Sequence, residues 1–303
     1  NDWLNVFLVA SPILAIVAKM FIEHYNLQNK NILIVSLRNT SLEILDYNFL
    51  KITPKKKDRY LERIFFDSPS GRKILNKIND SNRDFIVYSG WAYREVNWLL
   101  NSRRCKGHIY IEEGSGSYLS YRPYSRKHMT LIDFLNFNWR NKVNPIEGKG
   151  FFFRDDAHLF VGINEKSYPE INREKKIILT NIDKVQKYYN PKLVGIKIIG
   201  ITCSASRLKS KQNWKEMLVK LISFLPDNSV IKPHPSFTSS KKLTNIFYKI
   251  FQSVNSKKIS LCSSDVILEL EMLKDKKKII GPKSSMERYT KLFGSEYEKV
   301  KLY

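Results

Sequence analysis

The sequence predicts an α/β protein with two domains, each a parallel β-sheet covered by helices. Short apolar runs of strand length alternate with segments whose apolar residues recur at helical spacing. The chain has 303 residues, about twice an ordinary domain, and the alternation occurs once before residue 120 and again after residue 195. Two domains of similar size are therefore expected.

The first half begins with an apolar run and the turn Ser11-Pro12, after which helical spacing continues to about Tyr25. We expect its strands at residues 5–10, 31–37, 48–52, 84–90 and 107–113. Two further helices are expected at residues 71–80 and 92–102. Strands separated by helices form parallel βαβ units, so this half should be a doubly wound sheet.

The second half repeats the pattern, with strands expected at residues 194–204, 229–233, 257–262 and 277–282. Its helices are expected at residues 213–226, 242–254, 263–273 and 284–294. Between the halves, residues 121–175 are aromatic and irregular, as in a lid, a binding insertion or a domain rim. The sequence therefore predicts Rossmann-like domains over residues 1–185 and 186–303, facing a central cleft.

Charge and missing motifs narrow the functional classes. Lysine and arginine number 52 against 29 acids, for a net charge of +23, which predicts an anionic partner: nucleic acid, a membrane face or an acidic glycan. The three cysteines lack metal-ligand spacing, so we expect no metal site and a reducing compartment. Glycine motifs of dinucleotide enzymes, P-loop ATPases and serine hydrolases are missing, and no apolar run is long enough to span a membrane.

The segment KPHPS, residues 232–236, holds a histidine between two prolines at the end of a predicted strand. Proline fixes φ and removes backbone donors, so His234 should lie on a stiff, exposed turn. An imidazole held beside Lys232 suits proton transfer near an anion. An ordinary strand-end turn is the alternative.

Two other strand ends carry polar residues. Glu112 and Glu113 close one predicted strand and are followed by Gly114 and Ser115, where α/β sheets place ligands. One carboxylate could act as a base, or both could be solvated acids in a turn. Ser284-Ser285 follow a later strand and open a helix, an arrangement that forms either an anion site or a plain helix cap.

Glu112-Glu113-Gly114, His234-Pro235 and Ser284-Ser285, in this order, resemble the three motifs of bacterial sialyltransferases of glycosyltransferase families 52, 80 and 38. Residues 5–23 also resemble the first strand, small-Pro turn and helix of family 52 members. The match covers motifs scattered over most of the chain. It implies a GT-B fold with the donor CMP-sialic acid in the cleft and no metal or other cofactor.

The resemblance also implies residue roles. Glu113 would be the general base that deprotonates the acceptor, with Glu112 as the second candidate, and His234 would protonate or hydrogen-bond the departing phosphate. Donor-binding roles would fall to Lys232, Pro235, Ser284, Ser285, Asp265 with Glu269 as its alternative, Gly114 and Ser115. Two departures from the family pattern stand out: Glu replaces the Asp often found in the acidic motif, and no Arg follows His234-Pro235.

The resemblance predicts an inverting sialyltransferase that acts on a lipooligosaccharide or capsular acceptor in the bacterial cytoplasm, peripheral to the inner membrane. A polysialyltransferase and a GT-B transferase with another donor, such as CMP-Kdo or a nucleoside diphosphate sugar, are the alternatives. The basic surplus predicts contact with an anionic membrane surface or an acidic glycan. Nucleic-acid binding is disfavoured because no RNP, helix-turn-helix or zinc signature accompanies the charge.

Overall fold

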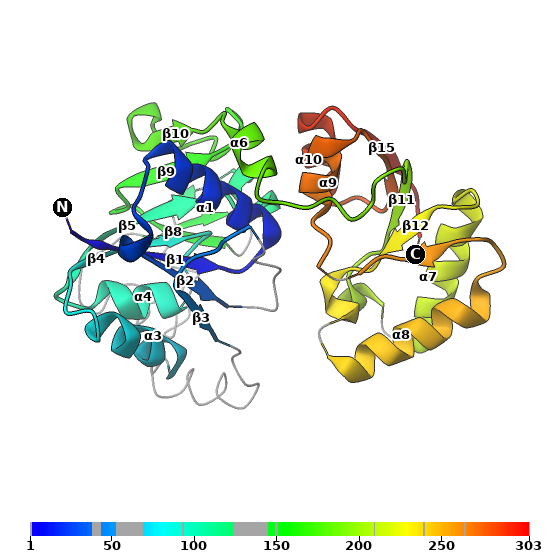
Figure 1. Cartoon of the computed structure of the whole chain (residues 1–303), viewed down its shortest axis with the longest axis horizontal. Helices are drawn as coiled ribbons and strands as arrows, with labels where there is room; N and C mark the ends of the chain where they lie inside the picture. The colour runs from blue at the N-terminus through cyan, green and yellow to red at the C-terminus, as the bar shows by residue number, and fades with distance from the viewer. Residues whose placement is uncertain are drawn as a thin grey trace. The chain divides into compact units, whose positions relative to one another are not determined.

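A computed structural model describes residues 2–37, 44–52, 69–92, 94–120, 122–123, 145–148, 151–208, 210–238, 240–263 and 265–302. The chain divides into two compact units, Asn1–Val185 (unit 1) and Gln186–Tyr303 (unit 2), each built around a parallel sheet (Figure 1). Each unit is described by itself.

Unit 1 contains a seven-stranded sheet in which every neighbouring pair of strands is parallel. Its strand order is β10 (Lys176–Ile178), β9 (Leu159–Gly162), β5 (Cys105–Ile111), β4 (Phe85–Ser89), β1 (Leu4–Val9), β2 (Ile32–Ser36) and β3 (Phe49–Lys51). The central strands β1 and β2 are buried along almost their whole length, as expected for a sheet covered on both faces.

The helices of unit 1 are α1 (Pro12–His24), α3 (Pro69–Asn79), α4 (Arg94–Leu100) and α6 (Ile182–Gln186), with short 3₁₀ turns η1 (Asn29–Asn31), η2 (Ser115–Tyr118) and η4 (Arg173–Lys175). Helix α1 begins as predicted, because Ser11 Oγ accepts the Leu14 N–H at 3.3 Å and Pro12 occupies the first turn.

The aromatic segment 121–175 is only partly described. It contributes β6 (Arg122–Pro123), β7 (Pro145–Gly148) and β8 (Phe151–Arg154), which form a small antiparallel sheet. From residue 159 onward the chain joins the main sheet through β9 and β10, so that part belongs to the rim of the first domain. Most of residues 121–150, where a lid or insertion was considered, lies outside the described residues.

Unit 2 contains a five-stranded parallel sheet in the order β13 (Ser260–Leu261), β12 (Val230–Lys232), β11 (Ile198–Ile201), β14 (Lys278–Gly281) and β15 (Glu296–Lys299). Its helices are α7 (Lys211–Phe224), α8 (Lys241–Val254), α9 (Leu268–Lys274) and α10 (Met286–Leu292), with 3₁₀ turns η5 (Ala205–Arg207) and η6 (Pro235–Phe237).

Strand order divides the helices of unit 2 into two layers. The chain moves outward from β11 to β13 through α7 and α8, and then crosses back to β14 and β15 through α9 and α10. Because such crossovers are right-handed, the two pairs of helices cover opposite faces of the sheet, as Figure 1 shows. A separate hydrophobic core fills each side: Met217, Leu221 and Phe247 on one, Leu268 and Met272 on the other.

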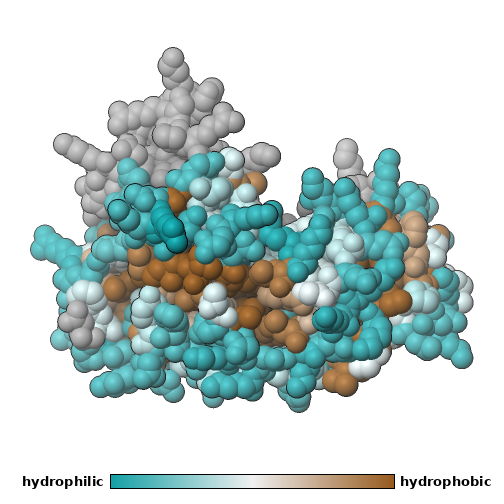
Figure 2. Space-filling view, turned by 90° about the horizontal axis from the view of Figure 1, so that it is seen from above, coloured by the Kyte–Doolittle hydropathy of each residue, from teal (hydrophilic) through white to brown (hydrophobic). Residues whose placement is uncertain are grey.

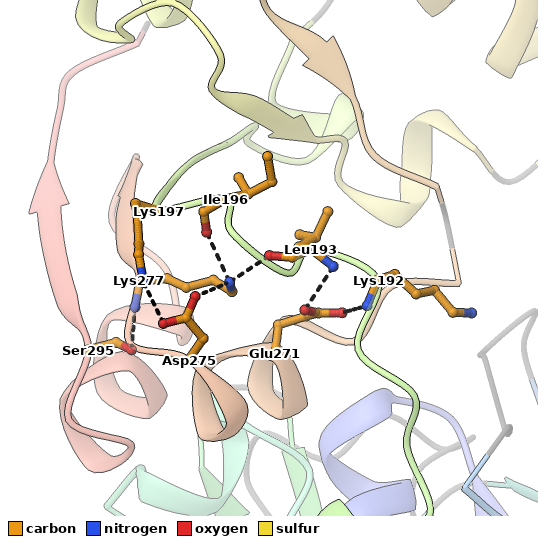
Figure 3. Close-up of polar contacts among 8 residues, drawn as sticks. All are labelled: Lys192, Leu193, Ile196, Lys197, Glu271, Asp275, Lys277 and Ser295. Carbon is orange, nitrogen blue, oxygen red and sulfur yellow. Dashed lines mark hydrogen bonds and ion pairs between the residues drawn. The ribbon is translucent and has the colours of Figure 1, made fainter.

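The segment that leads into β11 is held by two buried charges (Figure 3). The Glu271 carboxylate accepts the Lys192 and Leu193 backbone N–H groups at 2.7 and 3.1 Å. Lys277 Nζ, fully buried, donates to the Leu193 and Ile196 carbonyls at 2.9 Å each. These bonds fix where the sheet of unit 2 begins, since a buried charge without partners would be costly.

One expected element differs from its prediction. Helix α9 begins at Leu268 rather than at the serine pair 263–264, and its N-cap residue Ile267 makes no side-chain bond. Ile267 has extended backbone angles, and the Asp265 side chain bonds Lys192. Strands β9, β10 and β15 were not predicted, because each has only three or four residues and β10 and β15 are half-exposed edge strands.

Hydrophilic residues cover most of the surface drawn in Figure 2, and hydrophobic ones show mainly on unit 1. Within the described residues, no helix combines the length and apolar character needed to cross a membrane.

Candidate functional site

The sheet of unit 2 brings several predicted site residues to one edge. Strand β11 lies between β12 and β14, and all three are parallel, so their carboxyl ends, at Ile201, Lys232 and Gly281, share that edge. Strands β12 and β14 are two strand spacings apart, roughly 10 Å. The loops that hold His234 and Ser284 therefore leave the sheet within reach of one nucleotide-sized ligand.

The backbone around His234 is fixed on both sides of the residue. Its N–H donates to Thr202 Oγ1 at 2.8 Å, which ties the loop after β12 to the loop after β11. Pro235 opens the turn η6, where proline has no N–H to lose. The side chain itself is exposed. A stiff, exposed turn was predicted from the two prolines and is what the structure contains.

Hydrogen bonds fix the tautomer of His234. The Ser236 N–H donates to His234 Nδ1 at 3.1 Å, and the Ser236 hydroxyl lies 2.8 Å from the same nitrogen. A backbone N–H can only donate, so Nδ1 carries no proton and the neutral ring is protonated at Nε2. No described residue accepts that Nε2 proton. The ring thus offers a hydrogen-bond donor to a ligand.

The electrostatic setting keeps this ring neutral. Partial burial lowers the pKa of His234 below its ordinary value, and the Arg207 guanidinium lowers it further. Arg207 ends η5, the turn that follows β11. A neutral donor and a permanent cation therefore lie near each other at this edge, and that combination suits an anion such as a phosphate.

A second polar group lies on the β13 side of the same edge. Lys232 Nζ donates to the Ser263 carbonyl at 3.0 Å, and burial lowers the lysine pKa. Glu269 is buried, and desolvation raises the pKa of its carboxyl while the nearby Lys232 opposes that rise. The Asp265 carboxylate instead bonds Lys192 at 2.5 Å, which lowers the Asp265 pKa to about 2. Of these two donor-binding candidates, Glu269 lies near enough to Lys232 for their charges to interact, and Asp265 bonds Lys192.

Ser284 and Ser285 follow β14 but differ in what they do. Ser284 Oγ accepts the Met286 N–H at 3.2 Å and lies 3.3 Å from the Tyr297 hydroxyl, so it satisfies an amide at the start of α10. Ser285 makes no capping bond with its side chain. The plain-cap alternative describes Ser284 in this structure, while the Ser285 hydroxyl is not used in capping.

The acidic pair of unit 1 is split between two environments. Glu112 is completely buried and accepts hydrogen bonds from the Tyr118 hydroxyl (2.6 Å), the Ser167 hydroxyl (2.7 Å) and the Ile163 N–H (3.0 Å). It therefore ties the loop after β5 to the segment after β9. Glu113 is half-buried, and its backbone N–H donates to Ser117 Oγ at 3.0 Å.

Two glycines make room for this arrangement. A Cβ at Gly90, at the end of β4, would lie 2.0 Å from a carboxylate oxygen of Glu113, so only glycine leaves space for that side chain. Gly114 has φ 93°, a left-handed value that other residues rarely adopt. Ser115 opens η2, and its side chain lies outside the described part of the chain.

Sequence reasoning missed four residues of the unit 2 edge: Thr202, Ser204, Ser236 and Arg207. Ser236 Oγ accepts the Ala205 N–H at 2.8 Å and lies 3.5 Å from Ser204 Oγ, which joins the loops after β11 and β12. The predicted strand, residues 194–204, included Thr202 and Ser204, whereas β11 ends at Ile201. The change from apolar to polar residues after Ile201 was the available signal. Arg207 also places a guanidinium near His234, although no Arg follows the His-Pro pair.

A pocket elsewhere in unit 2 is a weaker candidate site than this edge. A pocket of about 580 Å³, lined by Asp227, Asn255, Ser256, Lys257 and Lys258, lies at the opposite, amino-terminal ends of β12 and β13. Its lining mixes an acid with lysines around an open rim. Among the described residues, no group of three or more His, Cys, Asp or Glu side chains could hold a metal ion.

No protein-family model matches this chain, and no curated protein matches it in sequence. Three solved structures share its fold. MnaA from S. aureus, in a co-structure with UDP, has 12% identity and a TM-score of 0.57 over 97% of this chain and 78% of that one. A UDP-GlcNAc 2-epimerase from Neisseria meningitidis bound to UDP-GlcNAc has 13% identity and a TM-score of 0.53 (98% and 83% covered). UDP-N-acetylglucosamine 2-epimerase from Rickettsia bellii has 11% identity and a TM-score of 0.51 (99% and 79% covered).

These comparisons correct the functional prediction. The sialyltransferase resemblance is wrong, and so are CMP-sialic acid as donor, the lipooligosaccharide or capsular acceptor, and the polysialyltransferase and CMP-Kdo alternatives. The three structures compared are a protein bound to UDP and two UDP-GlcNAc 2-epimerases. The physical reason is that the three motifs are strand ends, where this fold gathers polar residues whichever nucleotide it binds. Two motif residues, Glu112 and Ser284, bond backbone amides.

The fold prediction is confirmed. Both units are parallel α/β sheets with helices on their faces, and the solved structures that share this architecture are nucleotide-sugar enzymes of GT-B type. At these identities the likeness establishes the fold alone. The chain therefore has the fold of two Rossmann-like domains of GT-B type.

Proposed function

We propose that this protein is an enzyme that binds a UDP-sugar at the carboxyl edge of the unit 2 sheet and breaks the bond between the sugar C1 and UDP. The observation that carries the proposal is His234, whose Nδ1 accepts a backbone N–H so that an Nε2–H donor is offered at a strand end. The UDP and UDP-GlcNAc bound by proteins of the same fold support the choice of nucleotide.

In this proposal, His234 donates its Nε2–H to a phosphate oxygen of the departing UDP. Negative charge grows on that oxygen as the C1–O bond breaks, so a donor held there stabilises the transition state more than the bound substrate. Arg207 supplies a permanent positive charge to the same phosphate. The other proposed nucleotide contacts are Lys232, Ser285 and the buried Glu269. In this proposal the Glu269 carboxylate accepts a hydrogen bond from a ribose hydroxyl.

The fate of the sugar depends on what a base removes. Epimerisation at C2 requires the C2–H and C1–O bonds to break, which leaves a C1=C2 double bond, and both to re-form as UDP returns to C1 and a proton is added to the opposite face of C2. Two of the compared proteins are 2-epimerases. Glycosyl transfer requires deprotonation of an acceptor hydroxyl, which then bonds to C1. Glu113 is the proposed base in either case, because its partner Glu112 is fully buried and committed to three hydrogen bonds. We test epimerisation first and transfer second.

The test is incubation with UDP-GlcNAc in D₂O with EDTA present, followed by proton and phosphorus NMR. EDTA checks the expectation that no metal is needed. Deuterium at C2, together with the anomeric proton signal of a second UDP-sugar, would establish epimerisation. UDP release that depends on an added sugar acceptor would establish transfer. Either reaction should fall about 100-fold in His234→Ala and be unchanged in His24→Ala, since His24 is an exposed histidine on α1. No reaction and no UDP binding would contradict the proposal.

We also propose that the protein works against an anionic surface, either a membrane or an acidic glycan. The net charge of +23 supports this second part of the proposal. It concerns where the enzyme acts and is independent of the reaction.

A further inference from the structure

Unit 2 contains a long stretch of sequence without an acidic residue. Between Asp227 and Asp265 there is no Asp or Glu, while lysines recur throughout. The stretch includes the whole of α8, whose 14 residues carry three lysines. Such a run is unusual even for a basic protein, because surface helices commonly mix both signs of charge.

Helices α7 and α8 form one layer on the same face of the sheet. Both follow right-handed crossovers in the same direction, and they share the core that contains Met217, Leu221, Phe247 and Phe251. Lys257, just after α8, donates to the Ile222 carbonyl near the end of α7 at 3.0 Å. The carboxyl ends of the two helices therefore lie together, and their outer sides form one continuous surface.

We call this surface the α7–α8 face and define it by the exposed residues of the two helices. Its charged members are Lys211, Lys215, Lys220, Lys241, Lys242, Lys249 and Glu216. Its apolar members are Val219, Phe224 and Tyr248, which are 49%, 47% and 50% exposed. Along α8, Lys241 and Tyr248 are seven residues apart and so lie on one stripe, as do Lys242 and Lys249.

The lysines of the α7–α8 face are not neutralised by neighbouring acids. No ion pair among the described residues involves any of the six, and Glu216 accepts a hydrogen bond from Gln212 at 3.0 Å. Around the opposite layer some lysines are paired: Lys291 with Glu287 at 3.4 Å, and Lys197 with Asp275 at 2.7 Å. Lys274 and Lys276 are exposed there and form no ion pair among the described residues. The α7–α8 face differs in that none of its six lysines is paired with a described acid.

From this we infer that the α7–α8 face docks onto an anionic lipid bilayer, with its lysines on the headgroups and Val219, Phe224 and Tyr248 in the interfacial region. The lysine heads attract anionic lipid at about fivefold in affinity per residue. The three apolar side chains then gain by leaving water. Charge and exposed apolar side chains together are typical of surfaces that lie on membranes.

The apolar members select a bilayer over other polyanions. A nucleic acid or an acidic glycan would satisfy the lysines but offers no apolar phase for Val219 and Phe224. Single-strand binders add a groove that follows the backbone of the nucleic acid, whereas this surface is formed by the outer sides of two helices. A bilayer matches both the charge and the protruding apolar groups.

The test is flotation of the full chain with phosphatidylcholine vesicles and with vesicles of 70% phosphatidylcholine and 30% phosphatidylglycerol, at low and high salt. We expect binding only to the anionic vesicles, weakened by salt. The variant Lys241→Gln/Lys242→Gln/Lys249→Gln should bind roughly 100-fold more weakly. The variant Val219→Ser/Phe224→Ser/Tyr248→Ser should bind roughly tenfold or more weakly at the same salt.

The matched control is Lys274→Gln/Lys276→Gln/Lys291→Gln, which removes the same charge from exposed positions on the opposite layer. It should change vesicle binding by no more than about twofold, and thermal unfolding should show that all variants are folded. Equal losses in the control and the α8 variant would overturn the inference. Unchanged vesicle binding by both the Lys241→Gln/Lys242→Gln/Lys249→Gln variant and the Val219→Ser/Phe224→Ser/Tyr248→Ser variant would also overturn it. So would binding of the protein to DNA or polysialic acid but not to vesicles. The inference rests on the anionic surface of the proposed function and narrows it to a bilayer. None of these readouts involves a reaction, so the result is independent of the proposed reaction.

Discussion

The carboxyl edges of the two sheets use their polar residues in opposite ways. In unit 1 the buried Glu112 carboxylate gathers three donors, two of them from the segment after β9, and so holds loops in place. In unit 2 the backbone and hydroxyls of Thr202 and Ser236 hold His234, whose ring remains exposed with a donor to offer. The first arrangement satisfies groups internally, and the second leaves one unsatisfied for a ligand.

This difference separates structural polar groups from functional ones without reference to sequence motifs. A buried side chain whose hydrogen bonds are all internal stabilises the fold. An exposed side chain whose orientation is fixed by hydrogen bonds from neighbouring residues is positioned to bind a ligand. By this criterion Glu112 is structural, and His234 is the functional candidate. The predictions below test that assignment.

The largest expected effect is on the fold of unit 1. Glu112→Ala leaves the Tyr118 and Ser167 hydroxyls and the Ile163 N–H without their acceptor, and should lower the free energy of unfolding by about 4 kcal/mol. Urea unfolding measures this value. Glu113→Ala is the matched control, with an expected cost below about 1 kcal/mol. Equal costs for the two variants would remove the distinction between the acids.

The next effect is a loss of stability in acid that arises in unit 1. His108 on β5 is 2% exposed and lies 3.7 Å from Asp156, which also bonds the buried Arg154; His158 and Lys175 are near. Burial lowers the His108 pKa to about 4. The unfolded chain, with a histidine pKa near 6.5, therefore binds the proton first as the pH falls.

Stability should accordingly drop by about 3 kcal/mol between pH 6.5 and pH 4, because the neutral ring of His108 is favoured only in the folded state. Unfolding by urea at several pH values measures the slope. His108→Gln should flatten this part of the curve. A slope that persists unchanged in the variant would show that another group titrates there.

In unit 2 the predicted effect falls on activity rather than on stability. His234→Ala should reduce the UDP-sugar reaction about 100-fold, the lower range for a positioned proton donor, and change the free energy of unfolding by less than about 0.5 kcal/mol. Steady-state kinetics and urea unfolding of the same sample measure both. A destabilised variant with normal activity per folded molecule would place His234 with Glu112, among the structural groups.

The smallest effect should come from a positioning residue. Ser236→Ala removes the hydroxyl 2.8 Å from His234 Nδ1 but keeps the backbone N–H. The same hydroxyl accepts the Ala205 N–H, so the substitution removes two hydrogen bonds, of which one is to the imidazole. We expect about a fivefold fall in activity from the loss of that one bond. Nitrogen NMR of the imidazole should show a larger share of the Nδ1-protonated tautomer. An unchanged tautomer together with unchanged activity would rule out positioning by this hydroxyl.

Much of the fold was predictable because its strands are apolar and well separated. The runs before Ser11, at residues 31–37 and at residues 84–90 became β1, β2 and β4, since buried parallel strands are recognisable as short apolar segments. Strand β15, with the sequence EYEK, was not predicted because a half-exposed edge strand carries no apolar run. The strand is recognisable only in the structure, where it pairs in parallel with β14.

The candidate site was predictable in position but not in detail. Lys232, His234 and Ser284 were placed at strand ends, and the structure brings those ends to one edge. The sequence could not reveal that Glu112 is buried and Glu113 is not, because adjacent residues of a strand end differ only through long-range contacts such as those with Ser167. Nor could it specify the nucleotide, since strand-end motifs follow the fold.

The most direct test of the central claim is calorimetric titration of UDP and of CMP into the whole chain, its His234→Ala variant and its Glu113→Gln variant. The account predicts that UDP binds at least about tenfold more tightly than CMP, since a second phosphate can be reached by His234 and Arg207. It also predicts that His234→Ala weakens UDP binding and Glu113→Gln does not. Tighter binding of CMP, or UDP binding unaffected by His234→Ala, would contradict the assignment of the unit 2 edge as a site for a nucleoside diphosphate.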